Sequence, residues 1–228
     1  MKIEDFFAGE AARGWTYKLL ADCYQRPDDE TAEKINALTD VLKTICPMGA
    51  SYIASLANGL QKNFDLDHIK VDYARLFLGP FAMMAPPYGS VYLEGKRRLM
   101  GDSTLNALQR YREAGVGIDG DFKDAPDHIT VELEFMSFLI FKAIEASGNS
   151  DSAETVFSFE KQRSFFEDHL GAWVFEFVDA VEKNAAAEFY RNLVKATAAF
   201  LKEDYNIIFA VLNSEQHKRG NSLKQIHA

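Results

Sequence analysis

Apolar residues recur every three to four positions along nearly the whole chain, which is the spacing of one buried face of an α-helix. The first such face runs from Phe7 to Cys23 and ends before Pro27. A second begins at Asp28-Asp29, whose carboxylates suit a helix N-terminus, and stops at Pro47. Further apolar faces cover residues 53–64, 69–77 and 103–114. No stretch alternates for long with period two, so we predict an all-α fold.

The second part of the pattern predicts three long helices, near residues 127–147, 152–183 and 186–212. A Gly- and Asp-rich connector separates them from the earlier helices, and we interpret it as a hinge. We therefore predict a helical bundle of two subdomains that act as one functional unit. The expected ranges are 1–116 for the N-terminal half, 117–126 for the connector, 127–213 for the C-terminal half and 214–228 for a polar, mobile tail.

One long interruption of the helical pattern, from Phe81 to Gly95, holds two prolines and several aromatic side chains. This segment is too apolar for a solvated linker, so we expect an ordered loop. The loop either packs into its own domain or presents an apolar edge to a peptide, for which Met83 and Met84 would supply adaptable surface.

The charge balance narrows the class of partner. The 25 Lys and Arg residues stand against 34 Asp and Glu residues, which gives a formal net charge of −9. This balance argues against a nucleic-acid or anionic-membrane surface and leaves room for a basic partner. Around Lys123 the connector region gathers six carboxylates, those of Asp119, Asp121, Asp124, Asp127, Glu132 and Glu134. They are either a solvated loop with helix N-terminal acids or an acidic rim that receives arginines.

Patterns for catalysis or cofactor binding are sparse. The five histidines lack metal-ligand spacing, Cys23 and Cys46 fit neither a zinc site nor a redox pair, and no phosphate loop or dinucleotide motif is present, so we expect no metal and no cofactor. His128 and Glu132, four positions apart on a predicted helix, are either an acid/base pair or an exposed or capping pair. The acidic N-terminus and the lack of a long apolar run predict a cytoplasmic protein.

Four strings of residues occur in an order that resembles the TorD/DmsD/NarJ family of chaperones. They are Tyr73-x-x-Leu76-Phe77-x-Gly79-Pro80, Pro86-Pro87-Tyr88-x-Ser90-Val91-Tyr92, Pro126-Asp127-His128-Ile129-x-x-Glu132-Leu133-x-Phe135-Met136 and Gln162-x-x-Phe165-Phe166-x-x-His169-Leu170-x-x-Trp173. Together they span about residues 70–175.

The resemblance implies an all-α cytoplasmic chaperone that catalyses no reaction. Such a protein binds the twin-arginine leader of a molybdopterin-dependent oxidoreductase catalytic subunit and holds the apoenzyme until its cofactor is inserted. A leader of this kind needs carboxylates beside an apolar groove. We expect the leader and client site to comprise Pro126, Asp127, His128 and Glu132 with the apolar walls Tyr88, Tyr92 and Phe77.

Other readings of the sequence stay open. One is a small helical enzyme that uses His128 with Asp127 or Glu132 as acid and base. Another is an adaptor that recognises the mature client and not its leader. The client enzyme and the oligomeric state, including a homodimer, are equally undecided. Whether a guanine nucleotide binds is also undecided, and the chain contains no phosphate loop.

Overall fold

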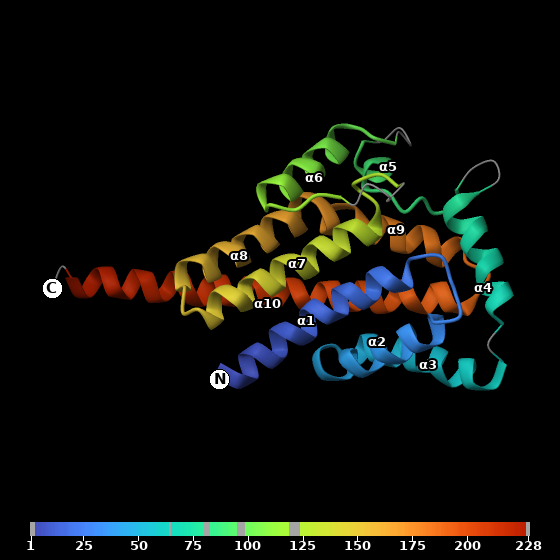
Figure 1. Cartoon of the computed structure of the whole chain (residues 1–228), viewed down its shortest axis with the longest axis horizontal. Helices are drawn as coiled ribbons and strands as arrows, with labels where there is room; N and C mark the ends of the chain where they lie inside the picture. Colours follow the sequence, from blue (N-terminus) through green and yellow to red (C-terminus); the bar gives the residue numbers. More distant parts are fainter. Residues whose placement is uncertain (1–2, 64, 80–82, 95–98, 119–123, 227–228) are drawn as a thin grey trace.

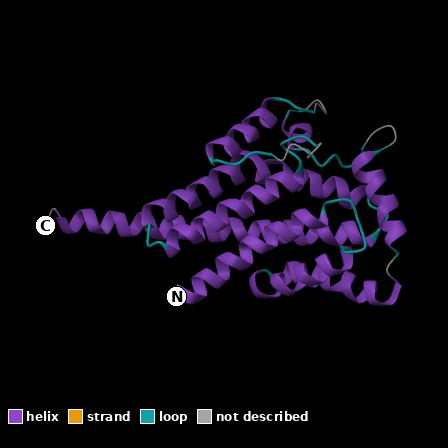
Figure 2. Cartoon of the chain, viewed as in Figure 1, coloured by secondary structure: helices purple, strands orange, loops and turns teal. Residues whose placement is uncertain are grey.

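The computed structural model describes residues 3–63, 65–79, 83–94, 99–118 and 124–226. Within these ranges the chain is helical, with an isolated antiparallel bridge between Tyr88 and His128 in place of any strand (Figure 2). The α-helices are α1 (Ile3–Cys23), α2 (Thr31–Ile45), α3 (Pro47–Asn63), α4 (Leu66–Tyr73), α5 (Gly89–Leu93), α6 (Asp102–Glu113), α7 (Ile129–Gly148), α8 (Ser152–Phe165), α9 (Gly171–Asn184) and α10 (Glu188–Ile226). Two π-helices, η1 (Ala74–Leu78) and η2 (Phe166–Leu170), complete the list. The prediction of an all-α bundle is confirmed.

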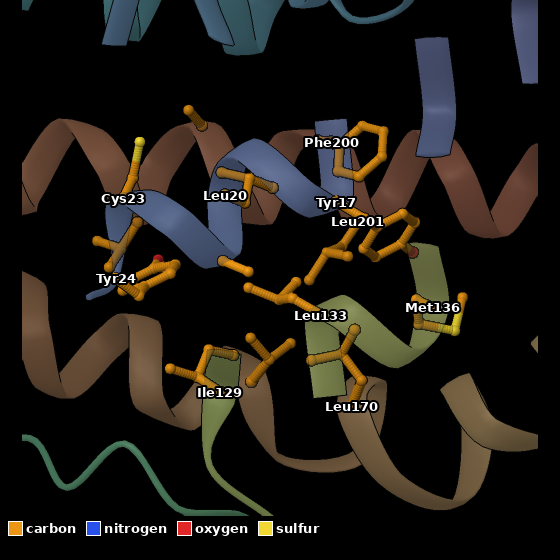
Figure 3. Close-up of a cluster of buried hydrophobic side chains, with 14 of the residues drawn as sticks. Tyr17, Leu20, Cys23, Tyr24, Ile129, Leu133, Met136, Leu170, Phe200 and Leu201 are labelled. Atoms are coloured by element: carbon orange, nitrogen blue, oxygen red, sulfur yellow. The ribbon is translucent and has the colours of Figure 1, made fainter. Parts of the chain in front are cut away.

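The core lies where α1, α7 and α10 run past one another along the length of the molecule (Figure 1). Figure 3 shows Tyr17 and Leu20 of α1 between Leu133 of α7 and Phe200 and Leu201 of α10. All five side chains are fully or almost fully buried. Helices α2 and α3 cover α1 and α10 on one side, and α8 and α9 pack against the other helices of the core.

This core joins the two predicted halves. Helix α1 belongs to the predicted N-terminal half and packs along α7, which belongs to the C-terminal half. The buried apolar side chains of both halves form one continuous cluster. Residues 119–123 of the predicted connector lie outside the described residues, so the hinge stays a prediction.

The long helix predicted over 152–183 is divided by η2 into α8 and α9. A π-helix places one extra residue in a turn, and such segments are frequent at functional sites. Gly171 follows η2 directly, and a Cβ there would lie 2.7 Å from the Phe166 carbonyl oxygen and 2.4 Å from its ring, so the close approach requires glycine. The apolar spacing continues through this segment, which is why the sequence pattern predicted a single helix.

Helix α10 continues past the predicted end of its apolar face. The expected polar tail, residues 214–228, is helical through Ile226 and projects beyond the body of the molecule (Figure 1). Six of the residues from 214 to 226 are Glu, Gln, Lys or Arg, which are good helix formers, and the tail contains no proline.

The described part of the predicted loop packs into its own domain. Ala85, Pro86 and Pro87 are buried, and the Ala85 amide donates to the Leu76 carbonyl oxygen at 3.0 Å. Met84 is 42% exposed. Helix α5, which the periodicity did not predict, follows within the same segment.

A polar cluster lies inside the bundle where α1, α8 and α10 meet. Arg13, 1% exposed, donates to Asp204 Oδ1 and to Glu10 Oε2, both at 2.5 Å, and to Gln162 Oε1 at 3.0 Å. Tyr17 donates its hydroxyl to the other Asp204 oxygen at 2.8 Å. Two carboxylates thus surround one guanidinium, which compensates for burying its charge.

Candidate functional site

Two of the strings that carry the family resemblance meet at the head of α7. Tyr88, just before α5, forms the antiparallel bridge with His128, just before α7. The Gly89 amide donates to the Asp127 carbonyl oxygen at 2.9 Å. This pairing places the N-terminus of α5 against that of α7, although about 40 residues separate them in the sequence.

Asp127 fastens this junction with its side chain. One carboxylate oxygen, Oδ2, accepts from the Ser90 amide at 2.7 Å, in the first turn of α5. The residue is 1% exposed. Its Oδ1 and the hydroxyl of Ser90 are buried, and neither has a hydrogen-bond partner in the described part of the structure. The Asp127 carboxylate therefore holds α5 against the head of α7 and does not face solvent.

His128 caps α7. Its Nδ1 accepts from the Thr130 amide at 3.2 Å and lies 2.7 Å from the Thr130 hydroxyl, so the ring proton is on Nε2. Burial lowers the pKa of His128 to about 4, although Asp124 and Asp127 act in the opposite direction. The imidazole is consequently neutral at physiological pH. The capping alternative is confirmed for His128, whereas exposure is not, because this residue is 6% exposed.

Glu132 is fully buried beneath this junction and is held by Trp173 of α9, whose indole Nε1 donates to Glu132 Oε2 at 2.8 Å. Burial raises the pKa of Glu132 well above its usual range, with a further contribution from the charge of Asp127 and an opposing one from Trp173. The indole also explains Gly89, because a Cβ at that position would lie 2.9 Å from Trp173 Nε1. Glu132, Trp173 and α5 therefore depend on one another for packing.

His169, on η2, approaches the same carboxyl group. Its Nε2 lies 2.8 Å from Asn106 Oδ1 of α6, and its Nδ1 is 4.0 Å from Glu132 Oε1, which is too long for a hydrogen bond. Burial and the nearby Arg110 lower the pKa of His169 to about 4. The neutral histidine thus links α6 to the buried cluster without a charge.

The predicted apolar walls differ in their placement. Phe77 of η1 is 3% exposed and packs in the core, with its ring centroid 5.9 Å from that of Phe177. Tyr92 stacks on Trp173 with a centroid separation of 5.6 Å and also meets Phe177 at 6.5 Å. Tyr88 is half-buried, and its ring meets that of His128 edge to face. Phe77 is therefore a core residue that supports Tyr92 through Phe177.

The structure changes the predicted acidic rim. Asp127 and Glu132 are buried. Asp127 accepts a hydrogen bond from the Ser90 amide in α5, and Glu132 accepts one from the Trp173 indole in α9. The exposed carboxylates are those of Asp124, which accepts from the Tyr88 hydroxyl at 2.8 Å, and Glu134. Asp119, Asp121 and Lys123 lie outside the described residues. Among the described acids of the predicted rim, Asp124 and Glu134 are therefore open to solvent, whereas Asp127 and Glu132 are not.

Three residues join the site that the sequence did not single out for it. Tyr111 of α6 donates its hydroxyl to the carbonyl oxygen of Pro126 at 2.9 Å, and Pro126 is itself half-buried. Trp173 and His169 belong to the fourth string of the resemblance, but their spacing in the sequence gives no sign that they reach Glu132. The contact with Tyr111 has no local sequence signal either.

Within the described ranges, no group of three or more His, Cys, Asp or Glu side chains is arranged to hold a metal ion. The helices described here also include none that has the length and apolar character needed to cross a membrane.

The chain matches the family model described as nitrate reductase delta subunit over residues 24–179. It is 30% identical over 172 residues to the Tat proofreading chaperone DmsD of Salmonella paratyphi A, covering 75% of this chain and 76% of that protein. It is 25% identical over 219 residues to the chaperone protein TorD of Shewanella pealeana, covering 90% and 93%.

The fold has a counterpart among solved structures. A redox enzyme maturation protein from Archaeoglobus fulgidus superposes with a TM-score of 0.52 at 24% identity, covering 83% of this chain and 93% of that one. The relatives named above are chaperones, which leaves the acid/base enzyme reading of His128 without support. The chain therefore belongs to the nitrate reductase delta subunit family, whose matched relatives are chaperones and not enzymes.

Proposed function

We propose that this chaperone works in the cytoplasm and binds the twin-arginine leader of a molybdopterin-dependent oxidoreductase catalytic subunit. It holds the apo form of that subunit while the cofactor is inserted, before export through the Tat pathway. The observation that carries the proposal is the convergence of three resemblance strings on one place, where Tyr88, Asp127 and Trp173 are joined by contacts to the head of α7. The relatives described above, which include a Tat proofreading chaperone, support it.

The charges near this place suit a cationic ligand. The chain carries a formal net charge of −9, and the exposed Asp124 carboxylate lies beside the half-buried ring of Tyr88. A guanidinium that forms a fork with a carboxylate in partly dry surroundings gains about 1.5–3 kcal/mol, against less than about 1 kcal/mol for an open surface pair. We assign Asp124 the role of receiving an arginine, with Tyr88 holding its carboxylate.

The remaining predicted site residues have supporting roles in this proposal. Pro126, Asp127 and His128 fix the head of α7, and Glu132 joins it to α9 through Trp173. Tyr92 and Phe77 keep the aromatic packing behind α5 in place. Their replacement would weaken leader binding through the shape of the site, whereas loss of Asp124 would act through charge.

Calorimetry with a client's leader peptide tests the proposal. We expect the peptide to bind, and we expect replacement of both its arginines by glutamine to weaken binding by more than about tenfold. In the protein, Asp124→Asn keeps an oxygen that accepts from Tyr88 but removes the charge, and should weaken the arginine peptide alone. Asp151→Asn is the matched control, because Asp151 caps α8 and Asn is an equally good cap.

The opposite result is equally clear. If the arginine and glutamine peptides bind the wild-type protein with equal affinity, recognition of a twin-arginine leader is wrong. If only the arginine peptide binds but Asp124→Asn matches Asp151→Asn, the leader proposal stands and the assignment of Asp124 falls.

A further inference from the structure

A second side of α7, next to Tyr111 of α6, is also lined by apolar side chains. Leu133 and Met136 point into the core, while Val131, Phe135 and Phe138 follow one another at helical spacing on another side of the helix. An apolar side of a helix is normally covered by other elements. Among the described residues the cover of this side is incomplete, and an open pocket of about 220 Å³ remains. We call it the α7 groove, and it is lined by Tyr111, Val116, Gly117, Ile118, Val131, Glu134, Phe135 and Phe138.

The size of the α7 groove limits what it can hold. Sites for cofactors and drug-sized ligands usually measure about 300–1,000 Å³. An apolar cavity of about 150 Å³ already accepts a benzene ring. At about 220 Å³ the groove fits one aromatic or a few aliphatic side chains, so a peptide segment suits it better than a whole cofactor.

The α7 groove is continuous with the site at the head of the helix. Tyr111 forms part of its wall and also donates to the carbonyl oxygen of Pro126. Val131 follows the cap residue His128 by about one turn. From residue 127 to Phe138 the helix advances about 16 Å, at about 1.5 Å per residue, and an extended peptide spans that length with about five residues. A ligand held near Asp124 therefore reaches the groove with the residues that come next in its sequence.

Charge at the rim favours a ligand that carries a cation beside its apolar part. Glu134 is the acidic lining residue, and its side chain is 45% exposed. Lys18 pairs with it at 2.7 Å, but the same ammonium group also pairs with Asp22 at 2.9 Å. One cation is thus shared by two carboxylates, so these three described side chains together carry a net negative charge.

We propose that the α7 groove holds the apolar stretch that follows the arginine pair of the client leader. The inference rests on the proposed function and assigns it a second contact surface, distinct from the residues at the head of α7. The arginines lie at Asp124, and the apolar side chains enter between Tyr111, Val131 and Phe138. Each of the two parts of the leader then has its own receptor on one continuous stretch of the chaperone.

A double-mutant cycle tests the groove. One partner is the substitution Phe138→Gln, which keeps the half-buried position filled but makes it polar. The other is a pair of synthetic peptides that share the arginine pair and differ only in a run of leucines or of serines after it. We expect the wild-type protein to prefer the leucine peptide by about tenfold or more, as burial of one large apolar side chain predicts, and Phe138→Gln to abolish most of that preference.

Two further variants make the result specific. Val131→Gln makes the same wall polar at a position whose native side chain is smaller than Phe138. It should also reduce the preference for the leucine peptide. Phe209→Gln is the matched control, because Phe209 is 51% exposed on α10 and takes no part in the groove. It should leave the preference unchanged. Circular dichroism and urea unfolding of each variant establish that it is folded at the binding temperature.

The outcomes separate the two proposals. If both groove variants retain the wild-type preference for leucine while binding still depends on the arginines, the groove inference is overturned and the proposed function stands. If neither peptide binds the wild-type protein, the proposed function fails and the groove inference fails with it. Loss of the preference in the groove variants, with the preference kept in Phe209→Gln, supports the groove.

Discussion

Two buried polar clusters in this protein differ in how completely their atoms are hydrogen-bonded. In the first, between α1, α8 and α10, Arg13 donates to Asp204, Glu10 and Gln162. In the second, beneath the junction of α5 and α7, Asp127 Oδ1 and Glu132 Oε1 are buried without a hydrogen-bond partner among the described residues. Both clusters are shielded from solvent to a similar degree.

The difference bears on how firmly each cluster fixes the helices around it. A buried group with all its bonds made stabilises one arrangement of the helices, because every alternative leaves a charge without its partner. A buried acid with an unpaired acceptor oxygen costs free energy. The second cluster lies in the region that we propose for client binding. The two clusters should therefore respond differently to substitution and to pH.

The largest expected effect is on the first cluster. Arg13→Met leaves Asp204 and Glu10 buried without their cation, and we expect the free energy of unfolding to fall by about 3–5 kcal/mol. Urea denaturation measures it. Arg110→Met is the control, since Arg110 and its partner Asp168 are about one third and one half exposed, and it should cost less than about 1 kcal/mol. Equal losses in the two variants would contradict the structural role of the Arg13 cluster.

A second effect appears on acidification. The folded-state pKa of His128, about 4, is below the value of about 6.5 for an unfolded chain. Its contribution to stability is therefore complete above about pH 6.5 and is lost as the pH falls to about 4, at a cost of roughly 3 kcal/mol. His128→Asn retains a cap for α7 without a titrating group, so its stability should fall less than that of the wild-type protein over this interval.

The measurement is urea denaturation of both proteins at several pH values between 4 and 7. His169 titrates in both and cancels in the difference. Parallel stability curves for the wild type and His128→Asn would show that burial of His128 does not favour its neutral form.

The smallest effect has the opposite pH dependence. Because burial raises the pKa of Glu132, its stabilising contribution is present below about pH 4.5 and is lost as the pH rises towards the folded-state pKa. Glu132→Gln keeps an oxygen for the Trp173 N–H and cannot ionise in the unfolded chain. Its stability relative to the wild type should therefore rise as the pH increases from 5 to 6.

Glu134→Gln is the matched control for this prediction, as it changes an exposed carboxyl two positions further along α7. It should show a much smaller change over the same interval. A pH-independent difference between Glu132→Gln and the wild type would indicate that Glu132 is ionised in the folded protein.

Much of the fold followed from residue spacing. The apolar periodicity of Phe7 to Cys23 predicted α1, and Pro47 correctly separated α2 from α3. The periodicity failed where the geometry changed without a change of spacing, as at η2, and where a helix continued without an apolar face, as in α10 beyond Leu212. It also missed α5, because a helix of this length has too few residues to show a period.

The site was less accessible to sequence reasoning. The strings around Tyr88, Asp127 and Trp173 identified the right region, and their order in the chain gave the family. The sequence could not show which of the acids near the head of α7 point into the protein and which point to solvent. Glu132 is buried because Trp173, 41 positions away, supplies its hydrogen bond, and no local pattern records that contact.

By itself, the sequence determined the helical fold class, the family and the acidic character that suits a basic partner, because these follow from spacing, residue order and charge counts. Only the tertiary structure decided which acids face solvent and which lie inside. Asp124 and Glu134 are exposed, while Asp127 and Glu132 are buried, although all four lie within eleven positions of one another. The physical reason is that burial and hydrogen-bond partners are set by α5 and α9, which reach α7 from distant parts of the chain.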